Sequence, residues 1–101
     1  MSTDFDTVIS EKTKKKTREP VRYKVLFLND NFTPIDWVID LLMSVFKHSE
    51  TAAKDLTMQV HNEGSAVVAI YSYEIAEQKT IQSISASRER GFPLQVTLEE
   101  E

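Results

Sequence analysis

The fold is decided by residues 23–29, YKVLFLN, together with the residues that follow at 30–34, DNFTP. After Lys24 the first stretch is nearly all apolar and rich in β-forming residues, which predicts a buried strand. The polar residues that follow predict a loop. Thr33 is then an expected helix N-cap, and Pro34 fits the first helical position. The pattern predicts a strand that passes through a short loop directly into a helix.

The helix continues as a run of apolar residues spaced by three and four, and it is apolar on more than one face. We therefore expect a well-buried helix, with Trp37 packed in the core rather than facing a partner. Asp36 is expected at the third helical position, where an acidic side chain favours the exposed amides. The apolar run consists of Ile35, Val38, Ile39, Leu42, Val45 and Phe46.

Cap and turn signals divide the next part of the chain. Ser49 is expected to cap a second helix that ends at Gly64, a left-handed stop. Residues 65–71 (SAVVAIY) predict a second strand, after which Ser72 caps a third helix that Gly91 ends. One side of the second helix is formed by Ala52, Ala53, Leu56 and Val60. The expected inner stripe of the third helix is Ile75, Ala76, Ile81 and Ile84.

Alternation with period two over residues 94–98 (LQVTL) predicts a third strand with one wet face, and the acidic end 99–101 is expected to fray. The order β-α-α-β-α-β predicts an α+β two-layer sandwich. A small three-stranded antiparallel sheet is expected to carry three helices on one face. Residues 1–20 have few apolar residues and no sustained period, which predicts a disordered N-terminal extension before one folded domain at 21–101.

The composition of the 101 residues excludes several classes of function. No apolar run approaches the ~18 residues of a membrane span, and the first residues lack the apolar block of a signal peptide. Without cysteine there is neither a disulfide framework nor a thiolate site. A formal charge of −4 disfavours nucleic-acid binding. We therefore expect a cytoplasmic protein with no membrane and no nucleic-acid partner.

Two polar segments stand where chemistry could occur: residues 29–34 (NDNFTP), after the first strand, and residues 60–64 (VHNEG), at the end of the second helix. Each has a structural explanation. NDNFTP is a good loop-and-cap sequence, and a histidine near a helix C-terminus, such as His61, is well placed against the helix dipole. For either segment alone, a structural role is the stronger interpretation.

A hydrolase is one alternative function. The chain has no G-x-S-x-G elbow and no cysteine nucleophile, and His48 and His61 form no H-E-x-x-H pattern. His48 is expected to be a solvated helix-end residue. We therefore expect no catalysis, no metal and no cofactor. A structural role is the second alternative, because the C-terminal domain of a ribosomal stalk protein has a similar α/β shape. Such a domain would not need both polar segments.

Four motifs in order resemble the ClpS family and cover roughly residues 20 to 100. Residues 26–42 (LFLNDNFTPIDWVIDLL) look like its segment L-x-N-D-D-x-T-P-hydrophobic, and residues 60–64 (VHNEG) resemble V-H-x-x-G. Residues 69–80 (AIYSYEIAEQKT) are similar to G-x-[YF]-x-x-E-[IV]-A-E-x-K. Residues 88–100 (RERGFPLQVTLEE) resemble the ending R-E-x-x-x-P-L-x-x-T-L-E. Four ordered motifs are far more specific than one.

The resemblance implies a non-enzymatic adaptor of the N-degron (N-end rule) pathway. ClpS proteins bind a protein whose first residue is Leu, Phe, Tyr or Trp and deliver it to ClpA of the ClpAP protease, or to ClpC in cyanobacteria and plastids. By position, the resemblance assigns α-amino binding to Asn29, Asp30, Asn31 and His61. It assigns the side-chain pocket to Thr33, Ile35, Val38, Val60 and Leu94. It assigns the surface for the N-terminal domain of the unfoldase to Glu74, Ala76 and Lys79.

The implied chemistry is physically reasonable. A charged α-amino group loses water when it enters a pocket, which is costly unless acceptors replace that water. Amide, carboxylate and neutral imidazole groups supply such acceptors. Two residues depart from the family: Asn31 replaces the second Asp of the motif, and Ile35 replaces the usual Met. Ile is stiffer than Met, so we expect a different ranking among bulky first residues. The resemblance also implies that residues 1–20 are engaged by the unfoldase pore.

Overall fold

The structure is a computed structural model, and it describes residues 21–101. The predicted N-terminal extension, residues 1–20, lies outside the described residues. Within the described part of the chain, no helix is both long enough and apolar enough to span a membrane.

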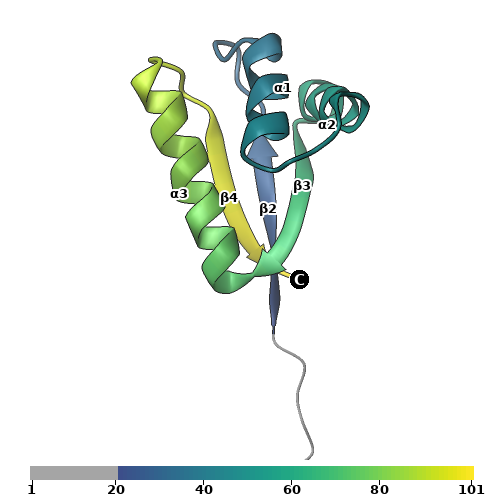
Figure 1. Ribbon diagram of the computed structural model, residues 1–101. Helices are drawn as coiled ribbons and strands as arrows, with labels where there is room; N and C mark the ends of the chain where they lie inside the picture. Colours follow the sequence, from purple (N-terminus) through teal and green to yellow (C-terminus); the bar gives the residue numbers. More distant parts are fainter. Residues whose placement is uncertain (1–20) are drawn as a thin grey trace, which may run out of the picture.

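Within residues 21–101 there are three strands and three helices in the predicted order (Figure 1). Its sheet has the order β3-β2-β4, and both pairings are antiparallel. In Figure 1, α3 runs along β4, whereas α1 and α2 lie near the end of β2 that leads into α1. The elements are β2 (Arg22–Leu28), α1 (Ile35–Ser44), α2 (Glu50–Glu63), β3 (Ser65–Ser72), α3 (Tyr73–Glu89) and β4 (Gln95–Glu100).

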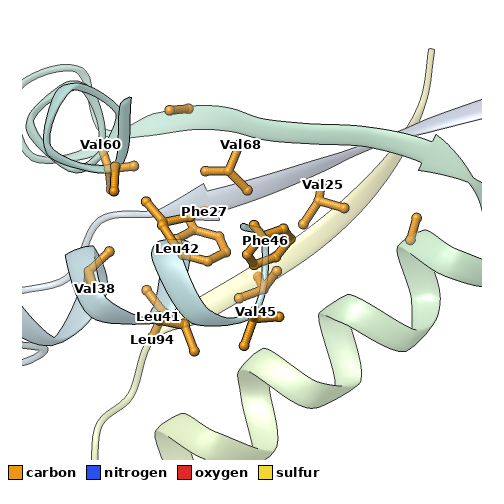
Figure 2. Packing of buried hydrophobic residues seen from close by; sticks show 14 residues of the cluster. Val25, Phe27, Val38, Leu41, Leu42, Val45, Phe46, Val60, Val68 and Leu94 are labelled. Carbon is orange, nitrogen blue, oxygen red and sulfur yellow. The ribbon is translucent and has the colours of Figure 1, made fainter. Parts of the chain in front are cut away.

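The core forms on one face of this sheet. Alternation along β2 turns Val25 and Phe27 inward, and neither side chain keeps any exposed surface. The Phe27 ring meets the Phe46 ring edge to face, with 5.6 Å between the ring centroids (Figure 2). A shift in the pairing of β2 with β3 leaves Val68 as an extra residue, which is buried. The central strand therefore contributes the deepest apolar side chains.

The beginning of α1 differs from the prediction. Thr33 is not the N-cap: the cap position falls on Pro34, and no side chain caps the helix. The Thr33 hydroxyl donates instead to Oδ2 of Asp30 at 2.8 Å, because the preceding turn competes for it. The helix also ends earlier, at Ser44. Val45 and Phe46 lie beyond it but are buried, as the apolar spacing predicted.

The inner face of α3 also differs. Ile75 and Ile81 were expected inside, yet they are 45% and 58% exposed. The residues that face the sheet are small: Ala76, Thr80, Ser83 and Ser87. The hydroxyls of Ser83 and Ser87 donate to helix carbonyls four residues earlier, so burial leaves them satisfied. Small side chains let α3 lie close to the sheet and leave Ile75 and Ile81 outside. The other two residues of the predicted stripe do face inward: Ala76 is buried, and Ile84 is partly buried against the core.

Among the other local predictions, those for the two ends of α2 are confirmed, and the one for the C-terminal residues is wrong. The Ser49 hydroxyl accepts from the Ala52 amide at 3.1 Å, and Gly64 is left-handed with φ of 94°, as predicted. The expected fraying of residues 99–101 is wrong: β4 runs to Glu100, and Glu101 forms two contacts with the Arg22 guanidinium, at 2.7 and 3.0 Å.

His48 is not a solvated helix-end residue. It is half-buried, and its Nε2 atom lies 2.6 Å from the Val68 carbonyl oxygen. Trp37 packs against the core, as predicted, and its ring meets the Phe92 ring edge to face at 5.2 Å.

Candidate functional site

The two polar segments singled out in the sequence meet at one end of the sheet. β2 and β3 pair with Leu28 opposite Ser65, so the residues just beyond this pair must also lie together. The Asn29 amide donates to the Gly64 carbonyl at 2.9 Å. This bond joins the end of β2 to the end of α2 and brings His61, on the last turn of α2, beside the polar loop.

The loop after β2 is held in shape by Asp30. Its Oδ1 atom accepts from the amides of Phe32 and Thr33, both at 2.7 Å, and its Oδ2 atom accepts from the Thr33 hydroxyl at 2.8 Å. Burial alone would raise the pKa of Asp30, but these hydrogen bonds and the positive charge of Arg88 outweigh it and hold the pKa below its ordinary value. Asp30 is therefore ionised at neutral pH and fixed in place.

A cavity of about 220 Å³ opens between the loop, α1, α2 and the start of β4. All the residues predicted for α-amino binding and for the side-chain pocket line this single cavity. Its wall consists of Leu28, Asn29, Asp30, Asn31, Thr33, Ile35, Val38, Thr57, Val60, His61 and Leu94.

The cavity wall is divided by polarity and burial. Asn29, Asn31 and His61 are exposed, whereas Val38, Val60 and Leu94 keep only 6%, 5% and 2% of their surface. The cavity therefore has a polar, solvent-facing end and an apolar, buried end. Such a shape suits a ligand with one charged or polar end and one hydrophobic end.

The polar end offers hydrogen-bond capacity that the fold does not use. Among residues 21–101, the side chains of Asn29, Asn31 and His61 take part in none of the side-chain hydrogen bonds of the structure. Asp30 differs, because three of the sites on its carboxylate oxygens are occupied by the loop. Asp30 therefore supplies mainly negative charge and loop geometry, while its neighbours supply free acceptors.

Two wall residues, Leu28 and Thr57, are not predicted from the sequence. Thr57 is 3% exposed, and its hydroxyl donates to the Ala53 carbonyl at 2.7 Å. The signal for Thr57 is the helical spacing of Ala53, Thr57 and Val60, which places them on one buried face although Thr57 is polar. Leu28 carries no signal beyond its place in the predicted strand.

The predicted unfoldase-binding residues do not form one exposed set. Glu74 is exposed, and Lys79 is half-buried with its Nζ atom donating to the Val45 carbonyl at 2.8 Å. Ala76 is fully buried, so its side chain cannot contact a partner directly. Among residues 21–101, no group of three His, Asp or Glu side chains could hold a metal ion.

The chain is similar to proteins of one family. Residues 18–97 match the family model described as ATP-dependent Clp protease adaptor protein ClpS. The chain is 44% identical over 98 residues to the ATP-dependent Clp protease adapter protein ClpS of Roseobacter denitrificans, covering 97% of this chain and 87% of that protein. It is also 44% identical to the protein of that name from Treponema denticola, covering 92% and 88%.

A solved structure is similar as well. It is Agrobacterium tumefaciens ClpS2 bound to L-phenylalaninamide, with a TM-score of 0.80 and 41% identity, covering 82% of this chain and 100% of that chain.

Proposed function

This chain belongs to the ClpS family of ATP-dependent Clp protease adaptors, and from its cavity we propose how it recognises N-end rule substrates. The free α-amino group of a substrate binds at the polar end, and a bulky hydrophobic first residue (Leu, Phe, Tyr or Trp) enters the apolar end. The observation that carries this proposal is the single cavity in which unused acceptors stand beside buried aliphatic side chains. The adaptor then delivers the bound protein to the protease.

The polar end matches the donors of an α-ammonium group. That group offers three N–H donors and one positive charge, and it needs acceptors when it leaves water. The amide oxygens of Asn29 and Asn31 and a ring nitrogen of His61 are the proposed acceptors. The Asp30 carboxylate lies in the same wall and provides the compensating charge. An acetylated N-terminus has lost the charge and two donors, so it is rejected.

The apolar end selects for size and hydrophobicity. Burying a large aliphatic or aromatic side chain contributes about 1.5–3 kcal/mol, which Gly, Ser or a charged residue does not gain. L-phenylalaninamide, the ligand of the Agrobacterium protein, combines a free α-amino group with an aromatic side chain. A ligand of that chemical form fits both ends of the cavity described for this chain.

We propose that the partner is the N-terminal domain of ClpA or ClpC, in the cytoplasm. The exposed side of α3 supports this contact, because it presents Glu74 and three partly exposed apolar side chains, Tyr73, Ile75 and Ile81. Residues 1–20 are proposed to be engaged by the unfoldase pore. A variant without residues 2–20 should keep peptide binding and lose delivery, and loss of peptide binding would contradict this division.

The direct test is calorimetry with three peptides that differ only at their first position. A Phe-initiated peptide is expected to bind, whereas its acetylated twin and a Gly-initiated peptide are expected to bind at least tenfold more weakly, a difference of about 1.4 kcal/mol or more. Equal binding of the acetylated peptide would contradict α-amino recognition. Equal binding of the Gly-initiated peptide would contradict the apolar pocket.

A further inference from the structure

Arg88 belongs to the last sequence motif, and its only contribution described so far is the charge that helps to lower the pKa of Asp30. Its Nη1 atom donates to two backbone carbonyls, those of Phe92 at 3.0 Å and Leu94 at 2.9 Å. These carbonyls flank Pro93 in the segment between α3 and β4. Leu94 forms part of the buried cavity wall and is 2% exposed. The side chain of Arg88 therefore holds the backbone of a wall residue.

The other backbone hydrogen bonds of the loop stop short of Leu94, whose side chain packs in the core. The Gly91 amide donates to the Arg88 carbonyl at 3.0 Å, and the Phe92 amide donates to the Ser87 carbonyl at 2.9 Å. Together with the left-handed Gly91, they form the double hydrogen bond that often ends a helix. The Phe92 ring also packs on Trp37. These contacts fix the chain as far as Phe92, and the pairing of Leu28 with Gln95 fixes it again inside β4.

Arg88 also lies within electrostatic range of the polar end. Burial raises the pKa of Asp30, and the charge of Arg88 acts with the hydrogen bonds from Thr33 and Phe32 to bring it below its ordinary value. A positive charge near this end repels a bound ammonium group. The charge of Arg88 alone would therefore weaken substrate binding. The hydrogen bonds from Arg88 to the Phe92 and Leu94 carbonyls would strengthen substrate binding.

We propose that Arg88 is a positioning residue for substrate selection: by holding the carbonyls of Phe92 and Leu94, it keeps the Leu94 wall packed against the first side chain of the substrate. This inference rests on the proposed function of the cavity. The two effects of Arg88 have opposite signs, so the direction of the change on mutation decides between them.

The test compares R88Q, R88K and R90Q as full-length proteins. R90Q is the matched control, because it also removes one positive charge near this segment. The Arg90 guanidinium lies over the Phe92 ring, 5.9 Å from the ring centroid. R88Q is expected to bind a Phe-initiated peptide about fivefold or more weakly, in line with the loss of hydrogen bonds from a charged donor. R88K should recover most of the affinity, and R90Q should bind as the wild type does.

An Ala-initiated peptide separates positioning from general destabilisation. Its small side chain does not reach the Leu94 wall, so R88Q should change its affinity little, and the Phe-to-Ala preference should fall. If R88Q binds the Phe-initiated peptide as tightly as the wild type or more tightly, the proposal is wrong. An equal loss for both peptides would also overturn it.

NMR of the protein without peptide tests the role of Arg88 independently of the proposed function. In R88Q, the titration midpoint of the Asp30 carboxyl should rise, and the methyl resonances of Leu94 should shift or broaden even without peptide. If the wild type bound none of the peptides, the proposed function would fail, and the Leu94 methyls would still decide the role of Arg88. Unchanged Leu94 methyls in R88Q would refute it.

Discussion

The Asn29 amide donates a hydrogen bond to the Gly64 carbonyl at 2.9 Å, and this contact joins two segments that are far apart in the sequence. Asn29 follows the central strand, whereas Gly64 ends α2 in a left-handed conformation, with φ of 94°. His61 lies one turn before Gly64. The bond therefore brings the Asn29 amide group and the His61 imidazole to the same cavity.

His61 should contribute an acceptor for the α-ammonium group of the substrate. Its side chain lines the cavity and is exposed at the polar end. We expect His61→Ala to weaken binding of a Phe-initiated peptide about fivefold or more, because an acceptor for a charged donor is lost, whereas His61→Gln keeps an acceptor and should retain most of the affinity. Asn62→Ala, next to His61 but outside the cavity wall, is the control and should bind as the wild type does. Equal affinities of His61→Ala and the wild type in calorimetry would remove His61 from the acceptors.

Ile35 should influence the ranking of bulky first residues. It lines the cavity and is 39% exposed, so it stands near the mouth rather than at the buried end. A β-branched side chain adapts less than a methionine. We expect Ile35→Met to change the order of affinities among Leu-, Phe-, Tyr- and Trp-initiated peptides by a few-fold. The measurement is a peptide panel that varies only the first residue, and an identical ranking for both proteins would rule the idea out.

Asp30 should contribute to stability at neutral pH and lose that contribution in acid. Its pKa is lower in the folded protein than the ordinary value of 3.8, despite burial, because of the hydrogen bonds from Thr33 and Phe32 and the charge of Arg88. A lowered folded pKa gives stability that is present above the unfolded pKa and disappears as the pH falls through the folded one. Thermal unfolding of Asp30→Asn should therefore show a smaller difference from the wild type at about pH 2.5 than at about pH 7. A difference that does not change with pH would contradict this.

The small inner face of α3 should not tolerate large side chains. Ser83 has no exposed surface, so Ser83→Leu is expected to lower the free energy of unfolding by about 1–3 kcal/mol or more through overpacking. Ile81→Ser, on the exposed side of the same helix, is the matched control and should change it by no more than about 0.5 kcal/mol. Urea denaturation measures both. The reverse order would mean that the sequence-based assignment of the inner stripe was right after all.

The sequence predicted the element order well because its local signals were unambiguous. Three signals each predict one local structure, and each prediction is confirmed: the apolar run of β2, the Ser49 cap and the left-handed Gly64. Membership of an adaptor family likewise confirms the prediction of a non-enzymatic protein. The residues proposed to bind substrate came from a family motif, and they do line one cavity. Their individual roles remain predictions.

The errors share a physical cause: competition between partners that no local pattern reveals. Thr33 is a good cap by type, but Asp30 takes its hydroxyl and its amide. Ile75 and Ile81 look like core residues, but close packing of α3 favours small residues that bond to their own helix. The acidic C-terminal residues predict fraying, but Glu101 pairs with Arg22, which lies at the other end of the domain sequence.

The central position of β2 has a mechanical consequence. β2 has a neighbour on each side, and its first residue is clamped to the chain end by the pair Arg22–Glu101. A force applied to the chain before Arg22 acts along β2, so it has to slide this strand past both neighbours at once. Forced extraction depends on the rate of unfolding. A motor that pulls on the N-terminal side of this domain would therefore have to break both pairings of the central strand at once.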